Sequence, residues 1–388
     1  MKILIILSRV PFPLEKGDKL RAFNQIKQLS RNHEISLFAI NDLGATSKHQ
    51  AVNVLSKYCK RIEIVNLAWF QIMYNIFRSL LSGLPLQVGY FYSSAAARKL
   101  QSLIDEVKPD HIYCQLVRTA EYVKHIKDIP KTIDYMDAFS KGVERRIPIA
   151  SPLFKLILKR ELKTLLKYEA TVMNWFDNSL IISSQDKEHL SFKDKERISI
   201  IPNGVDSTYF HPMILDKKYD ILFCGNMAYS PNIETAEYLV KEILPKLLPL
   251  HPDIKVAIVG TDPTSQVRAL KSKNVEITGW VEDMRTHYAS ARVFVAPMQT
   301  SIGMQNKLLE AMVMKIPCVT SSMANNAIGA VHEESILIGN DPDSYAEQIS
   351  ALLKDETKAA SIAESGYNFV NSTYTWEHVT DKLERFFS

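Results

Sequence analysis

The chain alternates between short apolar runs and segments with apolar residues at helical spacing, and this alternation constrains the fold more than any other feature. Runs such as KILIILS, EISLFAI and HIYCQL come first, and the pattern restarts after Pro202-Asn203-Gly204 with DILFCGN, KVAIVG and VFVAPM. Strands that alternate with helices predict a parallel sheet covered by helices on both faces. The sequence therefore predicts two α/β domains of the doubly wound, Rossmann-like kind.

The length of 388 residues agrees with two domains, because it exceeds what one ordinary core accommodates. We expect domains at 1–203 and 204–370, a linker around 205–220, and a C-terminal helix at 371–388 that packs back on the first domain. Ligands of doubly wound sheets bind beyond the carboxyl ends of the strands. With two such domains facing each other, the cleft between them is the expected site.

The composition is that of an ordinary globular protein, with 46% hydrophobic and 23% charged residues. The cysteines are Cys59, Cys114, Cys224 and Cys318, without CxxC spacing, so we expect buried thiols in a reducing compartment and no metal site. The apolar start MKILIIL is too short for a leader and predicts a buried first strand. No stretch approaches the roughly 20 apolar residues of a membrane-spanning helix.

The segment QTSIGMQNKLLEAMVMKIPCVTSS is the strongest candidate for a binding site. Gly303 allows an unusual backbone angle at a turn, and a helix is expected to begin just after it. The free N–H groups and positive dipole end of a helix start suit a phosphate, and Asn306 and Lys307 are near enough to assist. Glu310, one turn in, is able to accept hydrogen bonds from sugar hydroxyls. Taken alone, the segment also fits an ordinary strand-to-helix turn with an exposed helix acid.

The order of motifs along nearly the whole chain resembles the family 4 glycosyltransferases, which are retaining enzymes of GT-B fold. The motifs that carry the resemblance are PFP with Gly17 near the start, IPNGVDSTYFHP, LFCGNM, VAIVGTDP, VEITGWVEDMRTHYASARVFVAP, NKLLEAMVMKIPCVTSS and YTWEHV. Lys16-Gly17-Asp18, Pro231-Asn232 and Gln305-Asn306-Lys307 make the chain similar to the subgroup associated with exopolysaccharide and exosortase systems. The resemblance implies an acceptor-binding domain at 1–203 and a nucleotide-sugar-binding domain at 204–370.

The resemblance also implies where the donor binds. The nucleobase is expected against the loop of Trp280 and Val281, although a packed aromatic explains Trp280 equally well. The diphosphate is expected at the backbone of residues 303–305 and near Lys307, with the Gly17 loop closing on it from the first domain. The complete set of expected donor contacts is Gly17, Arg21, Gly225, Asn226, Trp280, Val281, Arg285, Gly303, Met304, Gln305, Asn306, Lys307 and Glu310.

The chain departs from the family pattern in two places. Relatives often carry a Glu-x7-Glu pair, but the first position here is Ile302, so only Glu310 remains. Many relatives have a basic clamp after the glycine of the second domain's first strand, where this chain has Asn226. We therefore expect Lys307, Arg285 or Arg21 to replace the clamp, or backbone N–H groups to bind the diphosphate alone.

The first domain offers Asp134 and Asp137 in place of a histidine that relatives frequently have at the end of the fifth strand. Either carboxylate is able to orient the acceptor or accept its proton, and helix capping or a loop salt bridge explains them equally well. We expect no enzyme nucleophile, no cofactor and no metal. The DPDS stretch at Asp341 and Asp343 fits helix capping better than metal binding.

Two stretches suggest how the acceptor arrives. Residues 66–93 are aromatic-rich with few charges, and residues 145–168 mix apolar residues with lysine and arginine. A basic amphipathic helix is typical of a membrane interface, and a core-packed helix with solvated lysines is an equal alternative. The membrane interpretation predicts a lipid-linked glycan acceptor and a cytoplasmic protein, peripheral at the inner face of the membrane. The net charge of +4 is compatible with anionic substrates, and no nucleic acid partner is expected.

The sequence fits other classes of function less well or leaves them open. A catalytically silent sugar-nucleotide-binding subunit of a polysaccharide assembly stays open because of Ile302 and Asn226. A phosphorylase needs a pyridoxal-bearing lysine that the motifs do not suggest. An NAD-binding protein is disfavoured because neither half has GxGxxG after its first strand.

Overall fold

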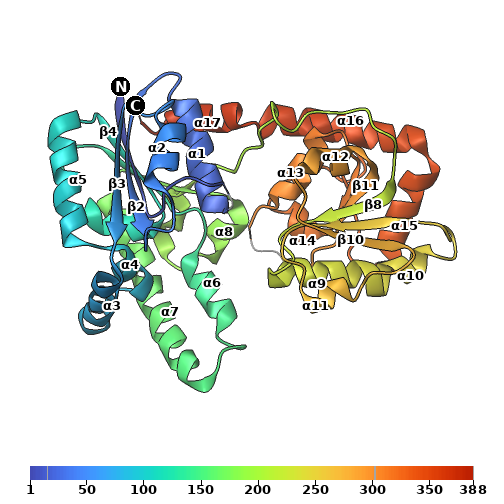
Figure 1. Cartoon of the computed structure of the whole chain (residues 1–388), viewed down its shortest axis with the longest axis horizontal. Helices are drawn as coiled ribbons and strands as arrows, with labels where there is room; N and C mark the ends of the chain where they lie inside the picture. The colour runs from blue at the N-terminus through green and yellow to red at the C-terminus, as the bar shows by residue number, and fades with distance from the viewer. Residues whose placement is uncertain (15, 301–302, 388) are drawn as a thin grey trace. The chain divides into compact units, whose positions relative to one another are not determined.

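The computed structural model describes residues 1–14, 16–300 and 303–387, which form two compact units (Figure 1). The first unit comprises Met1–Pro202 together with the end of the chain from Val379, and the second comprises Asn203–His378. Each unit is an α/β structure around its own parallel sheet. The predicted fold class, two Rossmann-like domains, is therefore confirmed.

The first unit has a seven-stranded sheet in the order β3-β2-β1-β4-β5-β6-β7, with every pair of strands parallel. Its strands are β1 (Lys2–Leu7), β2 (Glu34–Asp42), β3 (Arg61–Leu67), β4 (His111–Gln115), β5 (Lys131–Asp134), β6 (Asn178–Ile181) and β7 (Ser199–Ile200). Its helices are α1 (Gly17–Leu29), α2 (Lys48–Leu55), α3 (Trp69–Ser82), α4 (Leu86–Phe91), α5 (Ser94–Val107), η1 (Val117–Tyr122), α6 (Phe139–Arg146), α7 (Pro152–Val172), η2 (Met173–Trp175), α8 (Ser184–His189) and η3 (Lys193–Arg197).

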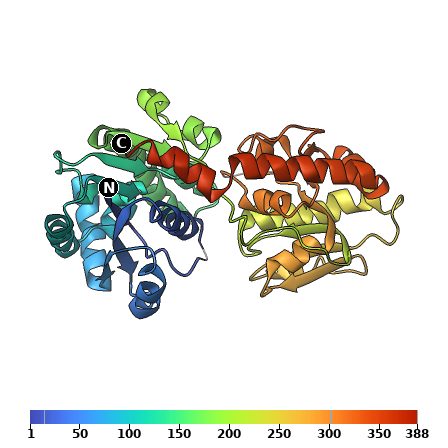
Figure 2. The same ribbon diagram turned by 90° about the horizontal axis from the view of Figure 1, so that it is seen from above.

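Helices cover both faces of the first sheet because its strands are apolar throughout. Successive side chains of a strand point to opposite faces. Leu4 and Ile6 of β1 belong to one core cluster with Leu100 of α5. Ile3 and Ile5 are equally buried and point the other way. Figures 1 and 2 show α1 and α2 on the side of the sheet opposite α5.

The second unit has a six-stranded parallel sheet in the order β10-β9-β8-β11-β12-β13. Its strands are β8 (Tyr219–Cys224), β9 (Val256–Val259), β10 (Val275–Gly279), β11 (Ala291–Ala296), β12 (Cys318–Thr320) and β13 (Leu337–Ile338). Its helices are α9 (Ser230–Tyr238), η4 (Leu239–Ile243), α10 (Leu244–Leu247), α11 (Ser265–Arg268), α12 (Met284–Ala289), α13 (Asn306–Val313), α14 (Ser322–Asn325), α15 (Pro342–Lys354) and α16 (Glu356–Thr373). The last helix, α17 (Trp376–Glu384), begins in the second unit and continues into the first.

In both sheets the first three strands are added in one direction, and the fourth is placed on the other side of the first. The strand order therefore switches between β1 and β4 and between β8 and β11. Ligands of doubly wound folds bind at such a switch point, outside the carboxyl ends of the strands. The residues that follow β1, β4, β8 and β11 are therefore the first places to look for a site.

The chain ends on the first unit. The backbone oxygen of Phe386 accepts hydrogen bonds from Thr132 Oγ1 at 3.3 Å and Asn178 Nδ2 at 3.0 Å. The Phe387 ring packs on His111 and Tyr113, with ring centroids 4.9 and 5.7 Å apart. These contacts attach the C-terminal segment to β4, β5 and β6.

Candidate functional site

The carboxyl end of β8 brings an ammonium group against a glycine. Lys307 Nζ, from the first turn of α13, donates a 2.6 Å hydrogen bond to Asn232 Oδ1 of α9. Asn232 Nδ2 in turn donates to the backbone oxygen of Asn226. A Cβ on Gly225 would lie 2.6 Å from Asn232 Nδ2 and 3.0 Å from Lys307 Nζ. Only a glycine lets the two side chains approach the backbone this closely.

Glu310 lies on the same helix and is held by a buried tyrosine. The Tyr288 hydroxyl, from α12, lies 2.9 Å from Glu310 Oε2 and 3.1 Å from Cys224 Sγ. Desolvation raises the pKa of Glu310, while the hydrogen bond from Tyr288 and the charge of Lys307 act in the opposite direction. Desolvation also lowers the pKa of Lys307. Both side chains retain partial solvent exposure, so the protein surrounds them closely without sealing them off.

The start of α13 provides free donors beside these side chains. Gln305 is the N-cap residue and makes no side-chain capping hydrogen bond, so the helix's first N–H groups have no capping side chain. Gly303 has φ +67°, as predicted for the turn that precedes the helix. Met304 packs on the core of the unit, and Asn306 Oδ1 accepts a hydrogen bond from Asn203 at 3.3 Å. Ile302 lies outside the described residues.

The residues expected at the nucleobase lie at the end of β10 and in the loop that follows. Trp280 is 70% exposed, which argues against the alternative of a packed core aromatic. Val281 packs on the core of the unit. Arg285 forms a salt bridge of 2.7 Å with Asp283, and its guanidinium lies 4.2 Å from the centroid of the Tyr209 ring. The Arg285 guanidinium is thus held by Asp283 and by the Tyr209 ring.

In the first unit, Arg21 and Asp134 form a buried ion pair. Both side chains are fully buried, and Arg21 Nε lies 2.7 Å from Asp134 Oδ2. The other guanidinium nitrogens donate to the backbone oxygens of Ile201 and Pro202, while Asp134 accepts from Tyr113 and from the backbone of Met136. This burial argues against the donor role expected for Arg21 and the catalytic role expected for Asp134. The pair instead attaches α1 to β5 and to the end of the first unit. Gly17 is exposed as the first residue of α1.

Asp137 has different surroundings, because it follows β5 and reaches solvent. Desolvation by the surrounding protein and the nearby charge of Asp186 raise its pKa to about 7, while Arg118 acts in the opposite direction. A carboxyl group that titrates near neutrality beyond the carboxyl end of a strand fits the expected proton acceptor. The alternative of a salt bridge to Lys141 is not realised, because Lys141 pairs with Glu144 at 2.6 Å.

Sequence reasoning missed three residues at these two sheet edges. Asn232 holds Lys307, although the Pro231-Asn232 motif was a signal for it. Tyr288 holds Glu310, and nothing in the run THYASARVF distinguishes it from a core aromatic. Arg118 lies between the rings of Phe91 and Phe139 beside Asp137, and only the tertiary structure brings these segments together.

The acids of the DPDS stretch and the cysteines lie outside this site. Asp341 caps α15, because its side chain accepts hydrogen bonds from the backbones of Asp343 and Ser344. The cysteines are all buried and unpaired, as predicted. Within the described ranges, no three His, Cys, Asp or Glu side chains gather as they would around a metal ion. No helix of the described chain is long and apolar enough to cross a bilayer.

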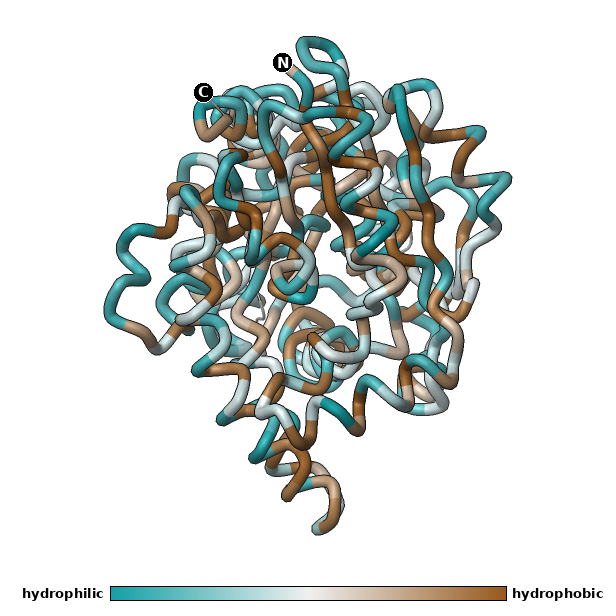
Figure 3. The backbone as a smooth tube through the Cα atoms, turned by 90° about the vertical axis from the view of Figure 1, so that its left-hand side faces the viewer, coloured by the Kyte–Doolittle hydropathy of each residue, from teal (hydrophilic) through white to brown (hydrophobic). Residues whose placement is uncertain are grey.

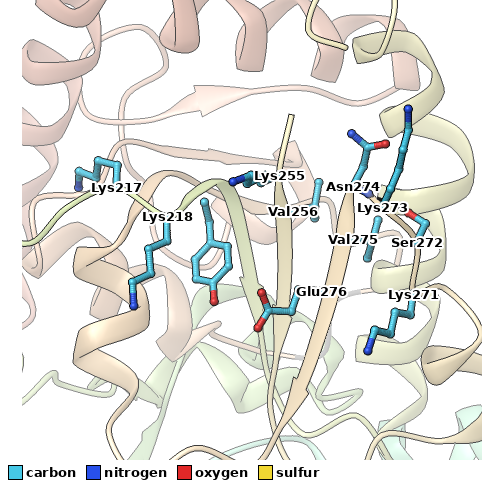
Figure 4. Close-up of a pocket in the computed structure, with 11 residues that line it drawn as sticks. Lys217, Lys218, Lys255, Val256, Lys271, Ser272, Lys273, Asn274, Val275 and Glu276 are labelled. Carbon is cyan, nitrogen blue, oxygen red and sulfur yellow. Dashed lines mark hydrogen bonds between the residues drawn. The ribbon is translucent and has the colours of Figure 1, made fainter. Parts of the chain in front are cut away.

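The second unit also has a basic cavity of about 600 Å³ (Figure 4). It opens at the amino ends of β8, β9 and β10, and its charged lining residues are Lys217, Lys218, Lys255, Lys271, Lys273 and Glu276. The Lys217 ammonium stabilises the fold, because its Nζ donates hydrogen bonds to the backbone oxygens of Ala289 and Ala291. This cavity lies at the edge of the sheet opposite the one where doubly wound folds bind their ligands.

The two Rossmann-like units are typical of the GT-B fold, and comparison with known proteins agrees. Residues 218–355 match the family model described as Glycosyl transferases group 1. Sucrose-phosphate synthase from Thermosynechococcus elongatus superposes with a TM-score of 0.72 at 17% identity, covering 100% of this chain and 98% of that one. Anabaena HepE in complex with UDP superposes with a TM-score of 0.70 at 16% identity, covering 99% of each chain.

Sequence relatives point the same way. The chain is 24% identical over 408 residues, 98% of each chain, to an uncharacterised 44.6 kDa protein in the cps region of Klebsiella pneumoniae. It is 27% identical over 205 residues, 46% of this chain and 51% of the other, to an Escherichia coli galactosyltransferase whose name gives α-D-GlcNAc-diphosphoundecaprenol as its acceptor. The family match lies within the second unit, and these findings together support a glycosyltransferase of GT-B fold.

Proposed function

We propose that the protein is a retaining glycosyltransferase that moves a sugar from a nucleotide-diphosphate sugar to a glycan or lipid-linked glycan in cell-surface polysaccharide or glycoconjugate synthesis. The observation that carries this proposal is the group formed by Lys307, Gly225 and the start of α13. It combines the ammonium of Lys307, the backbone of a glycine and helix N–H groups without a capping side chain, all beyond the carboxyl end of β8. Such a combination suits a diphosphate.

The chemistry follows from where charge develops. When the bond between the anomeric carbon and the diphosphate oxygen breaks, negative charge grows on the leaving nucleoside diphosphate. Lys307 and the N–H groups of α13 stabilise that charge without reorganisation, because Asn232 already holds the ammonium. The acceptor hydroxyl bonds to the anomeric carbon on the face that the diphosphate leaves, and its proton passes to the departing phosphate oxygen. We propose that this step proceeds without a metal or cofactor, with Lys307 and the helix N–H groups offsetting the charge of the leaving group.

Glu310 is proposed to bind donor sugar hydroxyls. Its Oε2 accepts the Tyr288 hydrogen bond, which leaves Oε1 for a ligand. HepE has been solved in complex with UDP and with UDP-glucose, and the E. coli relative is named for UDP-Gal, so UDP-sugars are the first donors to test. Asp137, with its pKa near 7, is proposed to orient the acceptor.

The test is a panel of UDP-, GDP- and TDP-sugars, with binding and hydrolysis measured for the whole protein. We expect one donor class to bind and to turn over slowly in the absence of acceptor. Glu310→Ala is expected to depress turnover strongly, and an unchanged rate would show that the donor binds elsewhere. Binding without turnover, even with lipid extracts as acceptor, would favour the alternative of a silent sugar-nucleotide-binding subunit. No binding at all would contradict both.

The acceptor is proposed to lie at a membrane surface, because α3 presents an apolar stripe to solvent. Phe70, Met73, Tyr74, Phe77 and Leu81 recur at helical spacing and are 59–76% exposed. Of the residues of α3, only Ile72, Asn75 and Ser79 are buried. A surface helix normally turns its apolar stripe toward the core, so an outward stripe this long indicates a partner.

The first half of α7 continues this apolar surface. Leu153, Phe154 and Leu156 are 55–71% exposed, and Ile149, just before the helix, is 87% exposed. The two helices are joined, because the Arg160 guanidinium of α7 donates to the backbone oxygens of Ser79, Leu80 and Leu84 at the end of α3. In Figure 3 the helical segment that projects lowest from the first unit is largely brown, the colour of apolar residues.

The charge of the surface favours an anionic bilayer. Exposed Arg78, Arg146, Lys159 and Lys163 lie on the same helices or beside them. Apolar residues that insert among lipid tails and cations that reach phosphate headgroups together are typical of interfacial helices. This surface supports a peripheral contact, through 66–93 and 145–168, at a membrane that carries the lipid-linked acceptor.

Vesicle flotation tests this surface. We expect the protein to float with vesicles containing phosphatidylglycerol, and the triple variant Phe70→Ser, Leu81→Ser, Leu153→Ser to stay at the bottom. The matched control replaces three exposed apolar residues of the second unit, with Ile214→Ser, Leu250→Ser and Val331→Ser, and is expected to float like the wild type. If the wild type fails to float at any salt concentration, the membrane proposal is wrong.

A further inference from the structure

The carboxyl edge of the first sheet holds an arginine that no part of the proposed donor chemistry uses. Arg118 belongs to η1, which follows β4 directly. Its guanidinium carbon lies 4.9 Å from the centroid of the Phe91 ring and 4.6 Å from that of the Phe139 ring. Rings on two sides hold the guanidinium plane in place and leave its edge free to donate hydrogen bonds.

The hydrogen bonds of Arg118 leave its charge unmatched. Among the described residues, its side chain donates only to Gln87 Oε1, from Nε at 3.3 Å and Nη2 at 3.1 Å. An amide oxygen is neutral, and no carboxylate of the described chain forms an ion pair with this guanidinium. Nη1 makes none of these hydrogen bonds. A partly buried cation without a counter-ion is costly, so the arrangement favours a ligand that brings negative charge.

A second guanidinium lies on the same ring. Arg9, which follows β1, lies 5.9 Å from the Phe91 centroid and pairs with Asp18 at 2.8 Å. Burial and the charge of Arg9 lower the pKa of Arg118 to about 10, and Asp18, Asp137 and Asp42 act in the opposite direction. The two arginines flank the switch point between β1 and β4, where a doubly wound sheet binds its ligands.

The backbone beside these groups is strained. Leu116, two residues before Arg118, has φ +67°, and Met136, next to Asp137, has φ +64°. Non-glycine residues with positive φ are costly and gather at functional sites, because the surrounding fold must hold them there. Both strained residues lie within two residues of the carboxyl end of a strand, Leu116 after β4 and Met136 after β5.

We propose that Arg118, assisted by Arg9, binds an anionic group of the acceptor, a phosphate or a carboxylate, and so orients the acceptor beside Asp137. This inference rests on the proposed function, because it concerns the acceptor of that same transfer. A phosphate would come from a lipid-linked acceptor and a carboxylate from an acidic sugar. Arg118 is then a specificity-determining residue, since a neutral acceptor would leave its charge unpaired.

Calorimetry with inorganic pyrophosphate tests this assignment on the whole protein. We expect two equivalents to bind the wild type, one at Lys307 and one at Arg118. Arg118→Gln is expected to lose one equivalent and Lys307→Met the other. The control Arg98→Gln removes the same charge from exposed α5 and is expected to keep both. Glucuronate, titrated in the same way with glucose as the neutral control, distinguishes a carboxylate acceptor from a phosphate one.

The variants separate this proposal from the proposed function. Binding that Arg118→Gln abolishes and Lys307→Met does not would keep the acceptor site and contradict the donor site. The reverse result, or binding of neither anion by the wild type, would overturn the acceptor site. Arg118→Lys keeps the charge but not the planar geometry, so we expect roughly tenfold weaker binding rather than none.

A measurement on the unmodified protein guards against a variant that fails to fold. Phenylglyoxal reacts with arginine side chains, and mass spectrometry locates the modified residues. We expect pyrophosphate or glucuronate to slow modification of Arg118 several-fold and glucose to leave it unchanged, with Arg98 equally reactive throughout. Equal modification of Arg118 with and without both anions would overturn the proposal.

Discussion

The carboxyl edges of the two sheets use cations in opposite ways. At the end of β8, Lys307 is tied to Asn232 and adjoins Glu310, so its place is determined by side chains of its own unit. At the ends of β1 and β4, Arg118 is held by aromatic rings and a neutral amide, and carboxyl groups surround it without pairing. The first arrangement suits the proposed diphosphate, and the second suits the proposed anionic acceptor group, which would supply the missing counter-charge.

These two edges show that the doubly wound fold determines where a site lies but not what it binds. Both sheets bring loops together at their switch points, and the residues in those loops decide the ligand. In the second unit, glycine and a helix start expose backbone donors to the ligand. In the first unit, strained backbone at Leu116 and Met136 presents long side chains instead.

Lys307→Met is expected to have the largest effect. It removes the ammonium beside Gly225 while keeping the length of the side chain, so kcat/KM should fall about 100-fold or more. The control is Lys315→Met, at the far end of the same helix, where the lysine pairs with Glu364. Equal kinetics for the two variants would show that the edge of the second sheet works through backbone N–H groups alone.

Gly225→Ala tests the position of the Lys307 ammonium without removing its charge. The added methyl would lie 2.6 Å from Asn232 Nδ2, so Asn232 and Lys307 must shift. Because misplaced charged groups stabilise a transition state poorly, we expect roughly a tenfold loss of kcat/KM. Gly142→Ala is the control, since a Cβ there meets nothing within 4 Å. Crystal structures of both variants would show whether the ammonium moved.

Tyr288→Phe is expected to affect stability more than rate. It removes the hydroxyl that contacts Glu310 and Cys224 in the core of the second unit, at a cost of about 1–2 kcal/mol. The pKa of Glu310 should rise further, because the hydrogen bond from Tyr288 holds it down. Urea denaturation compared with Tyr74→Phe, an exposed tyrosine of α3, checks the first expectation. A donor-binding profile against pH checks the second.

Asp137→Asn is expected to change stability by an amount that depends on pH. The folded pKa of about 7 lies above the ordinary 3.8, so folding favours the protonated form and the wild type loses stability as pH rises between these values. The variant should therefore unfold at a higher temperature than the wild type at pH 8, and at a similar temperature at pH 4. Asp186, Glu169, Asp18 and Arg118 are the charged groups facing it.

The control for that experiment is Asp128→Asn, which changes an exposed aspartate of the same unit. A Tm difference from the wild type that does not change with pH would contradict the raised pKa. If Asp137 also assists the acceptor, the variant's turnover should lose its rise with pH near 7, and an unchanged pH profile would limit Asp137 to a structural role.

Much of the fold was predictable from local patterns. The strand candidates from KILIILS to ILIGN all became strands, because uninterrupted apolar runs between helical segments are what a two-sided parallel sheet needs. The start of α13 and the turn at Gly303 were equally readable, since helix and turn preferences depend on neighbouring residues. The capping role of Asp341 was predictable for the same reason.

Side-chain partners were less predictable, because they depend on residues far apart in the sequence. Arg21 is a plausible diphosphate ligand by position, yet Asp134, more than a hundred residues away, buries it in an ion pair. Asp134 and Asp137 look equivalent in TIDYMD, but one points into the core and the other reaches solvent. The exposure of the apolar stripe of α3 could not be predicted either. Periodicity shows that a helix has an apolar face, but it does not show whether that face is buried or faces solvent.

By itself, the sequence determined the class of fold, the division into two α/β halves and the segment where a donor is expected. Those properties follow from hydrophobic periodicity, glycine positions and helix starts, all of which are local. Only the tertiary structure decided which charges are neutralised: Arg21 by Asp134, Lys307 beside Glu310, and Arg118 by no carboxylate of the described chain. Electrostatic pairing depends on distance in space, and the fold, rather than the order of residues, sets that distance.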